Sequence, residues 1–562
     1  IAKYKDKTND DQIIGHFGLG FYSAFMVADE VHIDTLSWQK DAKPVHWECD
    51  GGTEYDMQDG TRTEVGTCIT LFLNEDCLQF CNEYKATEVI KKYCSFMPVE
   101  IYVSRANTPE TQTILASEKL DSDHVIEEVK KEKEEDPDKL KITKRPELIN
   151  DTHPLWTKNP SECTKEEYVD FYRKVFMDYK EPLFWIHLNM DYPFNLKGIL
   201  YFPRVNLEYE NAEGVIKLYN NQVFIADNIK EVIPEFLMLL KGVIDCPDLP
   251  LNVSRSALQN DGFVKKISDY ITKKVADKLT GMCKTDRENY EKYWDDISPF
   301  IKFGCLKDEK FKEKIKEYVL FKDLNDKYST LSEYLETVPE PVVAEVVESD
   351  AEDENKEPEE KPKKTVYYVT DMQQQSQYIK MFKDQDMNAV VLLHNIDQPF
   401  VSALEAGDDD VRFQRIDADL TEAFKEETDE EALKDETETL KKLFQKATGR
   451  DNLEVKVEKL KDENLSSMIT LSEETRRMQD MMKMYSMNGM GGMDMSDMGQ
   501  TLVLNANNEL VQYVFDLKDD EQTEMFCQQL YDLAMISHQP LPAEKMTEFI
   551  QRRNKIMMLL TK

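Results

Sequence analysis

A glycine-rich segment near the start of the sequence, GHFGLGF from Gly15 to Phe21, contains residues that could bind phosphate. Glycines at positions 15, 18 and 20 allow backbone N–H groups to approach a ligand closely, and a helix that begins here would attract anions to its N-terminus. The spacing is not the G-x-G-x-x-G of dinucleotide-binding proteins, and no predicted strand leads directly into it. Taken alone, the segment is compatible with a phosphate site or with a purely structural turn.

A methionine-rich segment is the second candidate. Glycines at 489, 491 and 492 interrupt it, so its second half is expected to be a flexible loop. Methionine is polarisable and adaptable, which suits contact with varied apolar partners. The residues leave three interpretations open: contact with apolar segments of other proteins, packing in a core or a dimer interface, and binding of a soft metal. Nine of the 25 methionines belong to it, namely Met478, Met481, Met482, Met484, Met487, Met490, Met493, Met495 and Met498.

The end of the chain is predicted to form an amphipathic helix over residues 543–560. One face of this helix is mostly apolar and must pack against something, either within the same chain or on a second copy. The residues on this face are Met546, Phe549, Ile550, Arg553, Met557 and Leu560.

The elements that position these segments alternate between strands and helices, which indicates an α+β protein of several domains. Thr164 and Glu167 form a capping box, and helical spacing of apolar residues follows it over residues 168–176. Further helices are predicted at 82–96, 262–279 and 311–320. Strands are predicted at 31–36, 66–74, 185–190, 198–203, 215–227, 366–371, 388–393 and 453–460.

Composition excludes several classes of protein. Lys and Arg total 71 and Asp and Glu total 110, so the net charge of −39 repels phosphate backbones and argues against a role in coating nucleic acid. No apolar run approaches the roughly 18 residues needed to span a bilayer, and no segment resembles a secretory signal. The ten cysteines are scattered, with one C-x3-C pair at Cys77 and Cys81, so free thiols in a reducing cytoplasm and no metal site are expected.

Two charged segments are predicted to separate domains. Residues 118–145 contain few apolar side chains and cannot bury enough surface to offset the entropy of ordering, so a charged linker is expected over 105–147. Residues 338–364 are rich in proline and acids and are expected to form a disordered insertion.

Six motifs together resemble the ninety-kilodalton heat-shock protein chaperones, and among them the bacterial type. The resemblance covers nearly the whole chain, and its motifs follow the order found in that family. They are DQIIGHFGLGFYSAFMVADEV (11–31), GTCITLFL (66–73), INDTHPLWTKNPSECTKEEYVDFY (149–172), KGVIDCPDLPLNVSRSALQ (241–259), VYYVTD (366–371) and LSEETRRMQDMM (471–482).

The resemblance implies an ATPase of the superfamily that includes gyrase, histidine kinases and mismatch-repair proteins, with ATP and Mg²⁺ as cofactors. Thr67 would hydrogen-bond near the adenine. Arg255, supported by Asn252 and with Gln259 one turn further on, would contact the γ-phosphate and stabilise the charge that develops on it. The residues that would wrap the triphosphate are Gly15, His16, Phe17, Gly18, Leu19, Gly20 and Phe21.

The sequence also departs from the family pattern. The general base, the magnesium-binding asparagine and the D-x-G-x-G aspartate of the family lie upstream of the glycine-rich segment, and residue 1 is isoleucine. Residues 1–562 alone are therefore expected neither to bind ATP tightly nor to hydrolyse it, whereas the full-length protein does both. In LYNNQVFI (218–225), the family usually has basic residues where this chain has Asn220, Asn221 and Gln222. This difference argues against predicting a phosphate or client contact there.

The resemblance implies three parts. Residues 1–104 would be the C-terminal part of the ATPase α/β sandwich, 148–419 an α/β middle domain, and 420–562 a helix-rich domain that forms a homodimer. The implied function is an ATP-dependent chaperone that remodels unfolded client proteins in the cytoplasm, with neither nucleic acid nor membrane as a partner. A holdase that binds clients without nucleotide is an alternative, and a DNA-handling ATPase of the same superfamily is a less favoured one.

Overall fold

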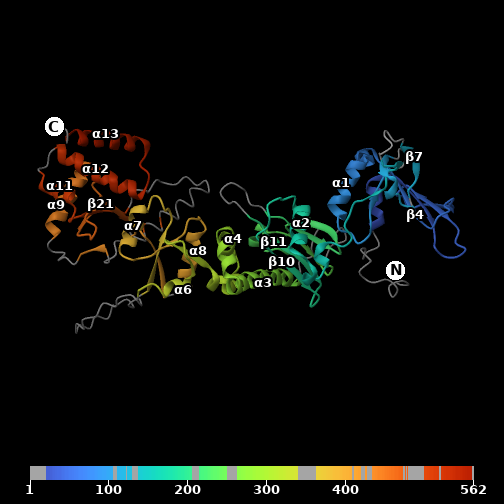
Figure 1. The fold of residues 1–562 in the computed structure, drawn as a ribbon, viewed down its shortest axis with the longest axis horizontal. Coiled ribbons are helices and arrows are strands. Elements are labelled where there is room, and N and C mark those ends of the chain that lie inside the picture. Colours follow the sequence, from blue (N-terminus) through green and yellow to red (C-terminus); the bar gives the residue numbers. More distant parts are fainter. Residues whose placement is uncertain are drawn as a thin grey trace. The chain divides into compact units, whose positions relative to one another are not determined.

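The computed structural model of the chain divides into two compact units, Ile1–Lys278 and Leu279–Lys562 (Figure 1). The domain boundaries expected from the sequence differ from this division and stay predictions. The predicted acidic insertion lies almost wholly outside the described residues. These are 20–105, 110–121, 123–129, 137–204, 214–249, 262–339, 363–407, 410–418, 424–426, 433–471, 475, 478, 499–517 and 521–559.

The first unit contains an antiparallel sheet with the strand order β3-β2-β1-β4. A 3-10 helix, Gly20–Met26, leads into it where the sequence predicts helical structure. The strands predicted at 31–36 and 66–74 are confirmed as β1 and β4, and the ATPase sandwich around them stays a prediction. The strands are β1 (Ala28–Leu36), β2 (Val45–Cys49), β3 (Asp56–Asp59) and β4 (Gly66–Leu73).

A second sheet in the same unit packs against helix α2 (Lys165–Phe176). This helix begins at the predicted capping box, in which Thr164 and Glu167 each bond to the other's backbone N–H. Trp156, Tyr172 and Tyr201 are fully buried in the core between α2 and the sheet. The strands, in the order β10-β11-β14-β12-β13, are β10 (Phe184–Met190), β11 (Leu196–Phe202), β14 (Lys241–Asp245), β12 (Ile216–Asn220) and β13 (Val223–Asp227).

The segment predicted as a charged linker contains a small antiparallel sheet, so the expectation that it lacks ordered structure is wrong for its described residues. The strands β6 (Thr111–Leu115), β8 (Lys139–Thr143) and β7 (Val125–Val129) pair in that order. Lysines alternate with Leu140 and Ile142 along β8, which collects the apolar side chains on one face, and Ile142 is fully buried. This segment follows helix α1 (Glu83–Cys94), which confirms the helix predicted at 82–96 and which the Asn82 side chain caps.

The second unit contains a mixed sheet in which β17 pairs in parallel with β18 and β19, as expected for an α/β arrangement. The boundary between the two units falls within helix α3 (Gly262–Thr285), and the predicted helix at 311–320 is confirmed in part as α5 (Glu309–Ile315). The remaining helices are α4 (Arg287–Lys307), α6 (Leu331–Leu335), α7 (Ser376–Asp384) and α8 (Asp397–Glu405). The strands, in the order β16-β15-β18-β17-β19, are β16 (Tyr328–Thr330), β15 (Leu320–Asp323), β18 (Val390–Val391), β17 (Lys364–Val369) and β19 (Val411–Arg415).

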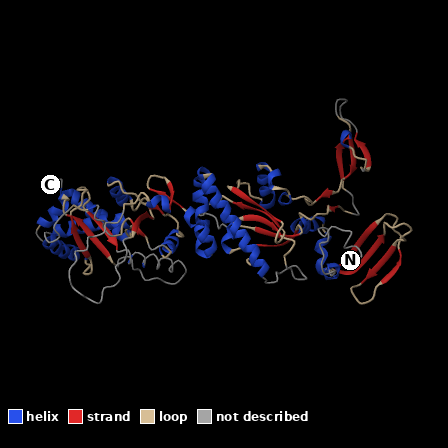
Figure 2. Ribbon diagram, turned by 90° about the horizontal axis from the view of Figure 1, so that it is seen from below, coloured by secondary structure: helices blue, strands red, loops and turns tan. Residues whose placement is uncertain are grey.

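The C-terminal part of the second unit combines helices with a three-stranded sheet in the order β20-β22-β21 (Figure 2). The sequence predicts β20 (Glu454–Glu458) and misses β21 (Ser467–Leu471) and β22 (Gln500–Asn505). Buried side chains such as Phe444, Leu502 and Val514 join the sheet to the helices. These helices are α9 (Lys434–Thr448), α11 (Glu509–Asp516), α12 (Glu521–His538) and α13 (Ala543–Leu559), and α13 confirms the predicted final helix.

Candidate functional site

Two residues of the glycine-rich segment, Gly20 and Phe21, are among the described residues. The other five predicted phosphate-binding residues, Gly15, His16, Phe17, Gly18 and Leu19, lie outside them. Phe21 packs edge-on against Trp47 of β2, with ring centroids 5.9 Å apart, and its side chain remains 37% exposed. The 3-10 helix is therefore fixed to one face of the β3-β2-β1-β4 sheet.

Thr67, the predicted adenine contact, lies on β4 directly opposite Thr35 of β1. The two hydroxyl oxygens are 2.8 Å apart, and the Thr35 hydroxyl also lies 3.4 Å from the carbonyl oxygen of Gly66. Thr67 remains exposed. Its hydroxyl has a protein partner and is still accessible to a ligand, since a hydroxyl can donate one hydrogen bond and accept two.

Strand register places Thr67 and Phe21 on the same face of the sheet. Thr67, Thr35 and Val45 lie side by side across β4, β1 and β2, and Trp47 is two residues beyond Val45 on the same face. Because Phe21 packs on Trp47, two candidate residues that are far apart in sequence share one surface. The nucleotide-binding role of these two residues stays a prediction.

The predicted catalytic loop lies between β14 and α3. Asn252, Arg255 and Gln259 fall outside the described residues, so their roles stay predictions. The described start of the loop is held firmly: the Asn220 side chain donates to the carbonyl oxygens of Cys246 (3.0 Å) and Pro247 (2.9 Å).

The departure from the family pattern at residues 220–222 has a structural explanation. Asn220 is 4% exposed and holds the start of the loop, while Asn221 and Gln222 adopt positive φ angles of 49° and 62° in the tight turn between β12 and β13. Asparagine tolerates this conformation better than most residues. These side chains build a turn and anchor a loop.

Asp245, the last residue of β14, is buried next to the same loop. Its Oδ2 accepts hydrogen bonds from the indole N–H of Trp156 (3.2 Å) and the backbone N–H of Gln222 (3.0 Å). Burial raises the pKa of Asp245 to about 6, although both hydrogen bonds favour the charged form. Sequence reasoning missed this residue, because its environment depends on Trp156 and on the turn between β12 and β13, which are distant from it in sequence.

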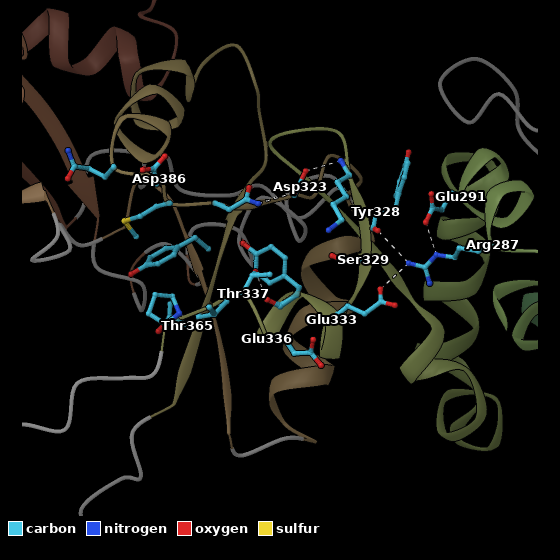
Figure 3. Close-up of a pocket in the computed structure, with 18 of the residues that line it drawn as sticks. Arg287, Glu291, Asp323, Tyr328, Ser329, Glu333, Glu336, Thr337, Thr365 and Asp386 are labelled. Carbon is cyan, nitrogen blue, oxygen red and sulfur yellow. Dashed lines mark hydrogen bonds and ion pairs between the residues drawn. The ribbon is translucent and has the colours of Figure 1, made fainter.

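A separate cavity of about 1050 Å³ lies in the second unit (Figure 3). Its acidic lining residues are Glu291, Asp323, Glu333, Glu336 and Asp386, against two basic residues, Arg287 and Lys327. The excess of carboxylates repels a triphosphate. This cavity is therefore a poor candidate for the nucleotide site.

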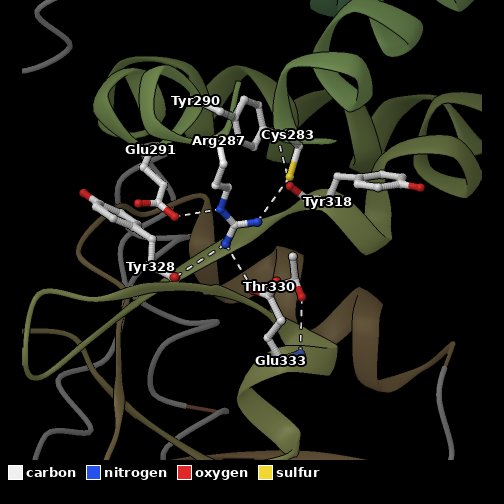
Figure 4. Close-up of polar contacts among 8 residues, drawn as sticks. All are labelled: Cys283, Arg287, Tyr290, Glu291, Tyr318, Tyr328, Thr330 and Glu333. Carbon is white, nitrogen blue, oxygen red and sulfur yellow. Dashed lines mark hydrogen bonds and ion pairs between the residues drawn. The ribbon is translucent and has the colours of Figure 1, made fainter. Parts of the chain in front are cut away.

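Arg287 in this cavity already uses its donors within the protein (Figure 4). Its Nε donates to Glu291 (2.6 Å), and its Nη2 donates to Glu333 (3.1 Å) and to the carbonyl oxygen of Tyr328 (3.4 Å). Its Nη1 lies 3.3 Å from the sulfur of Cys283. The guanidinium thus joins the start of α4 to β16 and α6 and has a structural role.

Comparison with known proteins identifies the family. Residues 79–343 match the family model described as Hsp90 protein. The chain is 38% identical over 523 residues to Chaperone protein HtpG of Bacteroides thetaiotaomicron, covering 92% of this chain and 70% of that protein. The chain belongs to the Hsp90 family. It is also 39% identical over 521 residues to HtpG of Porphyromonas gingivalis (92% and 69% covered) and 28% identical over 572 residues to HtpG of Borreliella burgdorferi (98% and 82% covered).

The resemblance to the bacterial type of the Hsp90 family, predicted from the six motifs, is therefore confirmed. Arg255 and Gln259 lie within the matched range 79–343, whereas the glycine-rich segment and Thr67 precede it. Within the described part of this Hsp90 family member, no helix is both long and apolar enough to cross a membrane.

Proposed function

We propose that this Hsp90 family member is an ATP-dependent molecular chaperone. It binds unfolded or partly folded clients and remodels them through an ATP-driven cycle in which a dimer opens and closes. One observation carries the proposal: 38% identity across 92% of the chain to a protein named Chaperone protein HtpG.

ATP binding is proposed for the surface that carries Phe21 and Thr67. Thr67 offers an exposed hydroxyl to an adenine nucleotide, and Phe21 lies on the same face of the sheet, which supports a shared ligand. Bound ATP, held with Mg²⁺, supplies the γ-phosphoryl group that water attacks. Arg255 would stabilise the negative charge on that group, and Gln259 would support the same loop.

The role of Arg255 is tested by ATP turnover of the full-length protein. Arg255→Ala should lower kcat by about 10²-fold or more, because a missing charge-stabilising donor costs at least that much. Arg204→Ala removes an exposed arginine of the same unit and should leave kcat unchanged. Equal rates for the wild type and Arg255→Ala would refute the proposed role.

A homodimer through α13 is part of the proposal. Arg552 of α13 donates two hydrogen bonds, of 2.8 and 2.7 Å, to Asp532 of α12, which fixes one side of the helix to its own chain. Ile550 and Met557 are 47% and 51% exposed. Those apolar side chains are available to a second copy of α13.

Light scattering of the intact chain tests this interface. Ile550→Glu together with Met557→Glu should weaken the dimer by about 10²-fold or more, because each charge would be buried against an apolar surface. Gln551→Glu adds a charge to the same helix away from the stripe and serves as the matched control. A wild-type monomer would contradict the dimer.

Client contact through the methionine-rich segment is also proposed. Met478, its one described methionine, is 40% exposed, which supports an accessible apolar surface. Changing Met487, Met490 and Met493 to serine should reduce protection of an aggregating client, and unchanged protection would exclude this segment. Protection that does not respond to ATP would favour the nucleotide-independent holdase.

A further inference from the structure

The face of the first sheet opposite Thr67 carries two histidines and three carboxylates. Antiparallel pairing of β1 and β2 sets His32 opposite Glu48 and Asp34 opposite His46. Because side chains alternate between the faces of a strand, these four residues project from one face and are near neighbours. An H-x-D sequence on one strand and an H-x-E sequence on the next thus create a single cluster.

Three potential ligand atoms converge in this cluster. Glu48 Oε2 lies 3.3 Å from His46 Nε2 and 3.8 Å from His32 Nε2, and the chosen ligand atoms all lie within 4.8 Å of one another. The side chains of His32, His46 and Glu48 are 23%, 19% and 34% exposed. The cluster is therefore sheltered and still reachable from solvent.

Two of these separations, His46–Glu48 and His32–Glu48, lie at or near those of a transition-metal site. Tetrahedral zinc with bonds of about 2.0–2.1 Å to nitrogen and oxygen places neighbouring ligand atoms about 3.3 Å apart. The His46–Glu48 separation already has this value, and the His32–Glu48 separation exceeds it by about half an ångström, which side-chain rotation can close. Imidazole nitrogen favours Zn²⁺, Cu²⁺ or Ni²⁺ over Mg²⁺ or Ca²⁺.

Neighbouring residues orient the imidazoles. His46 Nδ1 lies 2.8 Å from Asp34 Oδ1, and a hydrogen bond there leaves Nε2 free to face Glu48. This carboxylate–histidine pairing is the usual support of a metal-bound imidazole. The His32 ring is fixed against Phe72, with ring centroids 4.7 Å apart, and Glu30 Oε1 lies 2.8 Å from His32 Nε2 as a further carboxylate.

We propose that His32, His46 and Glu48 bind a divalent transition-metal cation, with Zn²⁺ the best match. Asp34 orients His46, and Glu30 or water completes the coordination. The cation would neutralise part of the charge of three clustered carboxylates and would join β1 to β2. The site uses the sheet face opposite Thr67 and is separate from the proposed nucleotide surface.

Nuclear magnetic resonance of the intact chain, labelled with ¹⁵N in histidine, tests the site directly. Adding Zn²⁺ should shift the imidazole nitrogens of His32 and His46, assigned with His32→Gln and His46→Gln, and leave those of the exposed His124 in place. Unmoved signals from His32 and His46 at saturating Zn²⁺ would overturn the proposal.

Binding measurements with Co²⁺ and Zn²⁺ provide the second test. His46→Gln and Glu48→Gln should each lower the affinity at least tenfold, and Asp34→Asn should lower it by about 10–100-fold through loss of the orienting hydrogen bond. His124→Gln and the double change Cys77→Ser with Cys81→Ser are controls and should retain this site. A thiolate-to-cobalt absorption band, or full affinity in His46→Gln, would assign the metal to cysteines and refute the proposal.

Discussion

A buried ion pair between α4 and α8 leads to the strongest stability prediction. Lys302 Nζ lies 2.5 Å from Asp397 Oδ1, with side chains that are 5% and 1% exposed. The other carboxylate oxygen of Asp397 accepts a hydrogen bond of 2.9 Å from the backbone N–H of His394. Asp397→Ala would leave a buried ammonium group without its counter-charge. Such a loss costs about 3–5 kcal/mol, so the free energy of local unfolding of α4 and α8 should fall by about that amount.

A double-mutant cycle measures the interaction energy between Lys302 and Asp397 separately from their interactions with other residues. Lys302→Met removes the charge and keeps much of the aliphatic volume, so Lys302→Met combined with Asp397→Ala should be less destabilised than the sum of the single changes by about 2 kcal/mol or more. Hydrogen exchange of peptides from α4 and α8 measures the local free energies.

An exposed ion pair of the same unit provides the control. Lys322 Nζ and Asp326 Oδ1 are 2.9 Å apart, with side chains 34% and 84% exposed, so Asp326→Ala should cost far less stability than Asp397→Ala. A loss below about 1 kcal/mol in Asp397→Ala, or strict additivity in the cycle, would refute the reasoning.

Three further predictions concern the first unit. The raised pKa of Asp245, about 6 against an ordinary 3.8, means that the folded state binds this proton more tightly than the unfolded state does. The free energy of unfolding should therefore fall by about 2 kcal/mol between pH 4 and pH 6. Urea unfolding at several pH values should show this decrease in the wild type and lose it in Asp245→Asn. Arg145 bonds both carboxylate oxygens of Asp123 and lowers the pKa of Asp123 to about 2, so Arg145→Gln should raise that pKa toward its ordinary value in an NMR titration. Thr164→Ala breaks the capping box with Glu167 and should destabilise α2 by about 1 kcal/mol, measurable by hydrogen exchange, whereas Ser161→Ala should cost less.

Local signals explain what the sequence could predict. The capping box at Thr164, the helix at 82–96 and the strands at 31–36 and 66–74 are encoded within a few residues, and the structure confirms each. The six motifs identified the family for the same reason, since each is a contiguous run. The helix at α13 and its mostly apolar face were also predictable, because the apolar residues recur at helical spacing.

Features that depend on pairing between distant segments were not predictable. The sheet of β6, β7 and β8 lies in a segment whose composition indicates a linker, and it forms because Ile142 and its neighbours meet on one face. The register between β1 and its neighbours β2 and β4 sets both the Thr35–Thr67 hydroxyl contact and the cluster of His32 and His46. The residue pattern of one strand does not reveal this register.

The central claim, that this chain acts as a chaperone, is tested most directly by client aggregation. A chemically unfolded enzyme is diluted into buffer with residues 1–562 or with an equal mass of serum albumin, and light scattering is followed over time. The chaperone account predicts that near-equimolar chain suppresses scattering well beyond the albumin control. Scattering that is the same in both samples would contradict it.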